Sequence, residues 1–152
     1  MTRFLAIISL VLLGLGLYST STFADNIQSY NLYLVARGNE ITGICVMEHR
    51  DGKTQGTIVS EFGMKILDFA FNGKKAKVKN VFAPLNKWYI RKVLNGDLTF
   101  LLKNLYKKEN MTKGSRTLMF GDKDDFELTN TKYKLKYCFR KMEGGIEDDA
   151  DK

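Results

Sequence analysis

The stretch Lys132–Arg140 reads KYKLKYCFR, and large apolar side chains alternate in it with mostly basic ones. Successive side chains of a strand point to opposite faces, so this alternation separates two surfaces. The apolar face carries Tyr133, Leu135, Tyr137 and Phe139. The other face carries three lysines, an arginine and Cys138. We therefore predict a half-buried antiparallel strand whose outer face is wet and positively charged.

Similar alternation appears upstream in segments separated by turn sequences. Asp51-Gly52 and Asn72-Gly73 are typical of tight hairpins, so the segments beside them are predicted to pair as antiparallel neighbours. The other predicted strands are Tyr30–Ala36, Ile41–Met47, Thr54–Phe62, Met64–Phe71, Lys75–Phe82, Thr117–Phe120 and Asp125–Leu128.

The period changes after Pro84, where apolar residues recur every three to four positions. Asn86 is placed to cap a short helix that Asn95-Gly96 would end. Asp97 is placed to cap a second helix with an apolar stripe on one face. That stripe consists of Leu98, Leu101, Leu102 and Leu105. We predict two short helices inserted between strands.

Together these elements predict a mainly β protein of the α+β class. About seven or eight strands would form one curved antiparallel sheet or a half-open β-barrel, covered by the two helices. The apolar stripes either fill a core or line a cavity between sheet and helices, and the pattern leaves both readings open. The residues assigned to this lining are Leu67, Phe69, Phe71, Val78, Tyr133, Leu135, Tyr137 and Phe139.

The N-terminus has the features of an export signal. Arg3 precedes an apolar run from Phe4 to Leu17, and a small-residue cleavage motif ends at Ala24. The run is shorter than the roughly 20 residues that span a bilayer, although a retained N-terminal anchor is the alternative. We predict a signal peptide over residues 1–24 and a chain exported to the periplasm or cell envelope.

The chain after the signal divides into two parts. The 152 residues are 44% hydrophobic and 27% charged, which indicates a globular chain, and the length suits one domain. We assign residues 25–142 to a single β-rich domain. Residues 143–152 (EGGIEDDADK) carry five acids and one lysine, and are predicted to form a flexible acidic tail.

The predicted domain is strongly basic. Residues 25–142 hold 22 Lys and Arg against 12 Asp and Glu, a net charge of +10. This charge is either a solvated surface or an attraction to an anionic membrane surface. No aromatic–basic nucleic-acid motif is present, and we expect no nucleic-acid partner.

The two cysteines, Cys45 and Cys138, lie 93 residues apart. In an oxidising compartment they could form a single disulfide bridge, and both also suit strands as small apolar residues. The sequence leaves these two readings open.

Residues able to carry chemistry are few. His49 is the only histidine, and in a strand it would lie roughly 13 Å from Cys45, too far for a Cys–His pair. The acidic cluster at 122–125 lacks the glycine and distal glutamate of a calcium loop. Nucleophile-elbow, P-loop and dinucleotide motifs are absent. We predict no catalytic residues, no metal site and no cofactor.

The stretch Thr54–Leu102 resembles exported bacterial proteins related to the lipoprotein-localisation carriers of the outer-membrane receptor type. The resemblance rests on GTIV at 56–59, EFGMK at 61–65, LDF at 67–69, the segment 87–94 and GDL at 96–98. It implies a half-open antiparallel barrel with a helical lid over an apolar cavity for acyl chains. The lipid-anchor cysteine of the receptor is missing here, which implies a form without a lipid anchor.

Two functions follow as expectations. The first is an exported, non-enzymatic protein that binds a lipid, or the acyl chain of a lipoprotein, in that cavity. The second is a structural or protein-interaction module of the cell envelope with a filled core.

Overall fold

The computed structural model describes residues 26–143. The predicted signal peptide (1–24) and, except for Glu143, the predicted acidic tail (143–152) lie outside the described residues. Within residues 26–143, no helix has the length and apolar character needed to cross a membrane.

The described chain forms one antiparallel sheet of nine strands in the order β5-β4-β3-β2-β1-β9-β8-β7-β6. The first and last strands pair with each other, so two meanders join at the centre of the sheet. The strands are β1 (Ile27–Ala36), β2 (Asn39–Arg50), β3 (Lys53–Ser60), β4 (Lys65–Phe71), β5 (Ala76–Lys79), β6 (Met111–Lys113), β7 (Arg116–Phe120), β8 (Phe126–Asn130) and β9 (Leu135–Lys141).

The mainly antiparallel α+β class was thus predicted correctly, and the count of strands was low. β6 was missed because three residues are too few to show an alternating pattern. The sheet is not closed, since β5 and β6 are its two edges.

Two-residue turns at Arg37-Gly38 and Asp51-Gly52 have positive φ at both positions, as tight hairpins require. Asn72-Gly73 differs from the prediction, because the β4–β5 turn spans residues 72–75 and only Gly73 has positive φ. There the Asn72 side chain accepts hydrogen bonds from the N–H groups of Lys74 and Lys75, at 2.9 and 2.8 Å.

The strand predicted from residue 132 begins at Leu135. Residues 131–134 form the turn that joins β8 to β9, in which Lys134 has φ of 55°. Tyr133 therefore lies in a turn and not on the apolar face of a strand.

The largest difference from the sequence prediction is helical. One continuous helix, α3 (Trp88–Asn104), stands in place of two short ones, preceded by the 3-10 turn η1 (Ala83–Leu85). Asn95, Gly96 and Asp97, expected to end one helix and begin the next, all lie inside α3.

Their polar and small side chains make contacts with the sheet instead of interrupting the helix. Asn95 Oδ1 accepts a hydrogen bond from the backbone of Val78 at 2.8 Å. A Cβ on Gly96 would lie 2.5 Å from the Arg116 guanidinium, so a larger residue would make that group shift. Asp97 is completely buried. The predicted break was wrong because tertiary contacts outweigh the local preference of these residues.

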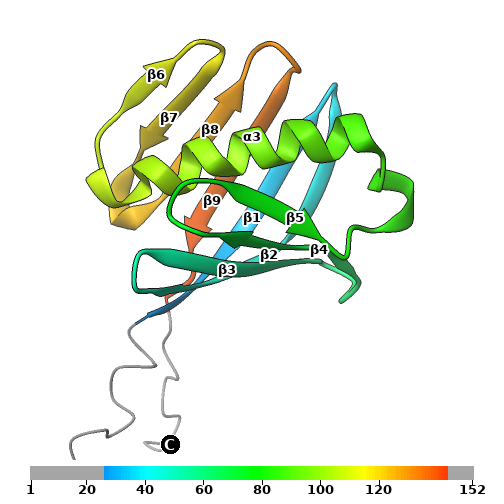
Figure 1. The fold of residues 1–152 in the computed structure, drawn as a ribbon, viewed down its shortest axis with the longest axis horizontal. Coiled ribbons are helices and arrows are strands. Elements are labelled where there is room, and N and C mark those ends of the chain that lie inside the picture. The colour runs from blue at the N-terminus through cyan, green and yellow to red at the C-terminus, as the bar shows by residue number, and fades with distance from the viewer. Residues whose placement is uncertain (1–25, 144–152) are drawn as a thin grey trace, which may run out of the picture.

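The core lies between α3 and one face of the curved sheet, as Figure 1 shows. Alternation places Leu67, Phe69 and Phe71 of β4 on this inner face, as predicted, and leaves the lysines of β5 exposed. The aromatic face of β9 joins the same layer through Tyr137 and Phe139.

The edge strand β5 is closed by α3. The backbone N–H of Ala76 donates to Thr99 Oγ1 at 2.9 Å, and that of Val78 donates to Asn95. Two residues one helical turn apart thus satisfy backbone groups that a sheet edge would leave unpaired.

Candidate functional site

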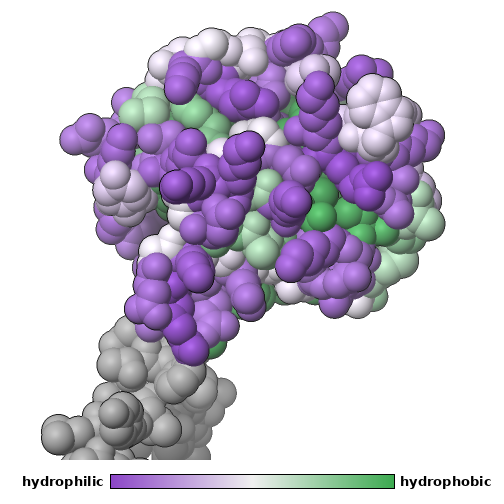
Figure 2. Space-filling view, viewed as in Figure 1, coloured by the Kyte–Doolittle hydropathy of each residue, from purple (hydrophilic) through white to green (hydrophobic). Residues whose placement is uncertain are grey.

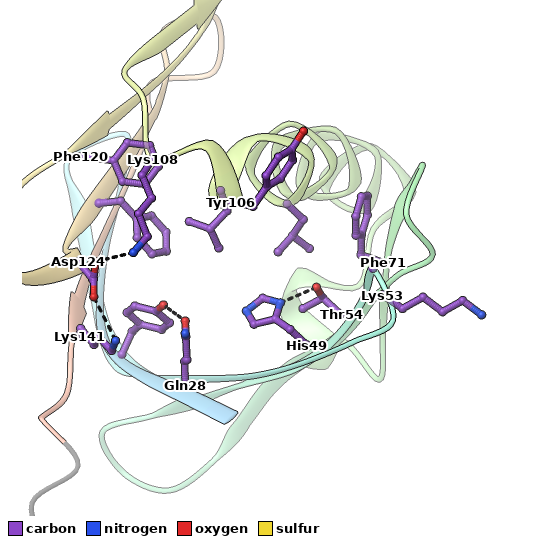
Figure 3. Close-up of a pocket in the computed structure, with 15 residues that line it drawn as sticks. Gln28, His49, Lys53, Thr54, Phe71, Tyr106, Lys108, Phe120, Asp124 and Lys141 are labelled. Carbon is purple, nitrogen blue, oxygen red and sulfur yellow. Dashed lines mark hydrogen bonds and ion pairs between the residues drawn. The ribbon is translucent and has the colours of Figure 1, made fainter. Parts of the chain in front are cut away.

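A pocket of about 400 Å³ opens at one end of the sheet, beside the C-terminal end of α3. Its walls come from strands at both sides of the sheet and from the 3-10 turns η2 (Leu105–Lys107) and η3 (Asp122–Asp124). Figure 3 shows side chains from the sheet and from the helical segment projecting toward a common space, while Lys53 extends away from it.

The inner part of the pocket is apolar. Tyr30, Phe71, Leu102 and Phe126 line it and are at most 6% exposed. The Tyr30 and Phe126 rings meet edge to face at 5.2 Å, and Phe126 stacks on Phe139 at 4.6 Å. These ring contacts hold the floor in a fixed arrangement, so the hollow is preformed.

The mouth of the pocket is polar, and its groups are paired. Asp124 accepts hydrogen bonds from Lys108 Nζ at 3.0 Å and from Lys141 Nζ at 3.2 Å. We call these three residues the lysine–aspartate cluster.

Two neutral pairs complete the mouth. His49 Nδ1 and Thr54 Oγ1 are 2.8 Å apart, and the Tyr30 hydroxyl donates to Gln28 Oε1.

The surroundings fix the charge states of these groups. Burial lowers the pKa of His49 and raises the pKa of Tyr30 to about 12. Hydrogen bonds from Lys108 and Lys141 hold the pKa of Asp124 below its usual value. At neutral pH the mouth therefore combines a neutral imidazole and a neutral phenol with one carboxylate and two ammonium groups.

Unusual backbone conformations place the lysine–aspartate cluster. Lys108, at the end of η2, has φ of 49°. Lys123 and Asp124 have φ of 55° and 64°, so two successive residues with side chains adopt the left-handed region. Aspartate tolerates this conformation better than most residues. The strained turn sets Asp124 between lysines that are 33 positions apart in the chain.

The residues predicted from sequence to line a cavity are distributed over several places. Leu67, Phe69, Phe71, Tyr137 and Phe139 are buried under α3, whereas Val78 and Leu135 are half-buried beside that layer. Of all eight, only Phe71 lines the 400 Å³ pocket. Most of the stripe is packed core.

A second hollow lies toward the N-terminal half of α3, where Figure 2 shows apolar residues surrounded by hydrophilic ones. It is an apolar groove of about 50 Å³, and Leu67 and Tyr137 are part of its lining. Leu85 of η1 and Leu94 of α3 cover it from the helical side. Its volume leaves little room for a ligand.

A buried polar cluster lies under the middle of α3. Asp97 accepts hydrogen bonds from Arg116 Nε at 2.8 Å, Asn130 Nδ2 at 2.7 Å and the Tyr137 hydroxyl at 2.7 Å. Burial, followed by the charge and hydrogen bond of Asp97, raises the pKa of Tyr137 well above its usual value. The cluster pins the helix to β7, β8 and β9. The sequence gives no signal for it beyond an aspartate in an apolar helical stripe.

The disulfide considered for Cys45 and Cys138 does not form, because both thiols are free. Cys45 is fully buried on the inner face of β2, whereas Cys138 of β9 is opposite in phase to the buried Tyr137 and Phe139. The two cysteines thus lie on opposite faces of the sheet, and β1 separates their strands.

The outer face of the sheet carries a wide depression of about 790 Å³. It is lined by Tyr33, Ile44, Cys138 and charged residues that include Lys136 and Arg140. Both Tyr33 and Ile44 are more than one third exposed, and Leu32 is the only buried residue among those that line it, so this depression lacks a continuous buried apolar floor. The pocket beside α3 combines such a floor with a polar mouth, which makes it the candidate site.

Among residues 26–143, no three His, Cys, Asp or Glu side chains are grouped to hold a metal ion. Comparison of the sequence with protein-family models gives no match, and comparison with curated proteins gives no significant match.

Proposed function

We propose that the protein is an exported, non-enzymatic carrier that binds a lipid, or the acyl chain of a lipoprotein, between its sheet and α3. The observation that carries the proposal is the 400 Å³ pocket with its buried aromatic floor and charged mouth. Each methylene group transferred from water to such a floor contributes about 0.8 kcal/mol. The proposal agrees with what the resemblance of residues 54–102 to lipoprotein-localisation carriers implies.

The polar groups of the pocket favour binding over catalysis. His49 is paired with Thr54, yet within the described chain no carboxylate orients the imidazole as a hydrolytic triad requires. The other polar groups form ion pairs or amide contacts at the mouth. They are placed to meet a headgroup.

A pocket-filling substitution tests the proposal. The mature protein is titrated with a fluorescent fatty acid, and Leu105→Trp is compared with Ile44→Trp on the outer face. Leu105 lines the pocket, whereas Ile44 is 38% exposed and outside it. We expect saturable uptake that Leu105→Trp reduces at least about tenfold, or about 1.4 kcal/mol, and that Ile44→Trp leaves unchanged. Absence of saturable uptake by the folded protein would overturn the carrier proposal.

We further propose that the carrier meets an anionic membrane surface with the start of α3 and the β3–β4 turn. Trp88 is 70% exposed and packs edge to face with Tyr89, while Phe62 in the turn is 86% exposed. The N–H of Phe82 bonds the carbonyl of Ile66 at 2.8 Å, which ties the chain just before η1 to the start of β4.

Basic residues lie close in sequence to these exposed aromatic rings. They are Lys65, Lys87, Arg91 and Lys92, all exposed. Exposed aromatic rings within a basic surface suit the headgroup region of anionic lipids.

Trp88 is the only tryptophan of the chain and reports on this contact directly. We expect its emission to shift to shorter wavelength with phosphatidylglycerol vesicles and to remain unchanged with phosphatidylcholine vesicles. The shift is expected to weaken with salt, since exposed charges are screened. A Lys87→Gln/Lys92→Gln variant should lose the shift, whereas Lys132→Gln/Lys134→Gln in the distant β8–β9 turn should keep it.

The rival proposal is an interaction module with a filled core, and the packed stripe of Leu67, Phe69 and Phe139 favours it. It predicts that Leu105→Trp changes neither ligand uptake nor partner capture. Deletion of residues 143–152 should alter partner capture alone under this proposal.

A further inference from the structure

The polar groups at the mouth of the pocket are mainly hydrogen-bond donors. Each lysine ammonium of the lysine–aspartate cluster has three N–H groups and uses one of them on Asp124. Two donors therefore remain on each. The cluster has one carboxylate for two cations, so it keeps a net charge of +1.

The neutral side chains Gln28 and His49 add further polar atoms to the mouth. Gln28 accepts the Tyr30 hydroxyl through its oxygen, which leaves its amide N–H groups for other partners. His49 bonds Thr54 through Nδ1, which leaves Nε2 at the mouth. The pocket thus presents cationic and amide donors around an apolar floor.

Asp124 occupies the place that an external anion would take. It lies between Lys108 and Lys141, with 46% of its side chain exposed, and holds the two ammonium groups together. Their own side chains are 69% and 36% exposed, so both remain accessible from the mouth. An anionic group arriving there meets two preassembled cations whose partial neutralisation by Asp124 limits its affinity.

From this arrangement we infer that the ligand is a single-chain amphiphile with an anionic headgroup, a carboxylate or a phosphate. Lys108 and Lys141 bind the headgroup, and the alkyl chain lies on the floor made by Tyr30, Phe71 and Phe126. The inference rests on the proposed carrier function and specifies its ligand class. Neutral headgroups leave the net charge of +1 on the lysine–aspartate cluster uncompensated, and cationic headgroups are repelled.

Calorimetric titration with matched twelve-carbon amphiphiles, below micelle formation, tests the inference. The probes are dodecanoate, dodecyl phosphate, dodecyl maltoside, dodecyltrimethylammonium and inorganic phosphate alone. We expect the two anions to bind at least about tenfold more tightly than the neutral and cationic probes, since each charge-assisted bond contributes strongly. Inorganic phosphate alone should bind at least about a hundredfold more weakly than dodecyl phosphate, because it lacks the chain.

Two variants with opposite expected signs separate a headgroup role from a structural one. Lys108→Gln/Lys141→Gln should remove most of the preference for anions, while Asp124→Asn should raise the affinity for dodecanoate several-fold by freeing both lysines. Asparagine also tolerates the left-handed backbone at this position. If the cluster only maintained the local structure, both variants would bind dodecanoate more weakly. Lys77→Gln/Lys79→Gln, on the exposed face of β5, is the matched charge control.

The failure modes are distinct. Equal binding of all headgroups would overturn the anion preference and leave the carrier function standing. Binding of none of the amphiphiles would overturn both. Inorganic phosphate that binds as tightly as dodecyl phosphate would identify a free-anion site and overturn the lipid class.

Discussion

The two halves of the layer beneath α3 are built from the same types of residue and are filled differently. Under the middle of α3, Asp97 binds three partners, and the groove that remains toward the N-terminal half measures about 50 Å³. At the C-terminal end, the polar groups lie at the mouth and leave a hollow of about 400 Å³.

In this protein the apolar layer is solid where the polar groups lie at its centre and hollow where they lie at its rim. Polar groups at the centre of the layer satisfy one another and draw helix and sheet together. Polar groups at the edge pair with one another at the rim and leave the apolar layer behind them open.

The largest expected effect comes from removing Asp97, the shared acceptor of the buried polar cluster. Asp97→Ala leaves Arg116, Asn130 and Tyr137 without their shared acceptor, so we expect the free energy of unfolding to fall by about 3–5 kcal/mol. Urea denaturation measures this loss. Asp122→Ala, at an exposed position, should stay within about 0.5 kcal/mol of the parent. A loss below about 1 kcal/mol for Asp97→Ala would show that the cluster does not hold the helix.

Truncating one leucine of the packed core and one leucine of the pocket sharpens the contrast between the solid and the hollow part of the layer. Leu101 is fully buried in the packed layer, so Leu101→Ala should lower the free energy of unfolding by about 3 kcal/mol. Leu105 is half-buried at the pocket, and Leu105→Ala should lower it by about 1 kcal/mol. Equal losses for Leu101→Ala and Leu105→Ala in the same denaturation experiment would contradict the presence of a hollow beside Leu105.

The mouth of the pocket should also give the protein a pH dependence. Burial keeps the pKa of His49 below its ordinary 6.5, so the unfolded chain takes up this proton first. His49 therefore contributes stability above pH 6.5 that is lost as the pH falls below it.

His49→Gln should reduce the change of the urea denaturation midpoint with pH between about pH 7 and pH 5. The lowered pKa values of Asp68 and Asp124 act in a separate window, since their contribution is lost only as the pH falls below 3.8. An unchanged slope in the variant would exclude His49 as its source.

The smallest expected effect is a difference in thiol reactivity between the two faces of the sheet. Cys138 is partly exposed on the outer face, and Cys45 is buried in the core. Maleimide treatment followed by mass spectrometry should show one label in the native protein and two in denaturant. Burial raises the pKa of both thiols, so even Cys138 should react slowly. Failure of either to react in denaturant without reductant would indicate a disulfide.

Much of the sheet could be predicted because alternation is a local property. The inner faces of β4 and β9 follow from residues such as Phe69 and Tyr137, whose sequence neighbours are charged or small. The continuous helix could not be predicted, because Asn95, Gly96 and Asp97 have partners on β5, β7, β8 and β9 that are distant in sequence.

The candidate site was harder still to foresee. Its mouth joins Lys108, Asp124 and Lys141, three charged residues that no motif connects. Whether a cavity remains depends on how the side chains pack in three dimensions, and a pattern of apolar positions in the sequence does not specify that packing. The predicted stripe therefore identified the layer and missed the pocket, except at Phe71.

The contacts of Asn95 and Thr99 with the backbone of β5 also affect how this protein behaves among other copies of itself. The N–H groups of Ala76 and Val78 in the edge strand β5 are already bonded to α3, so they cannot pair with an extended segment of another chain. Detachment of α3 would expose these N–H groups together with the apolar inner face of the sheet. We therefore expect heat-induced aggregation to begin with the helix lifting away, well before the strands themselves separate.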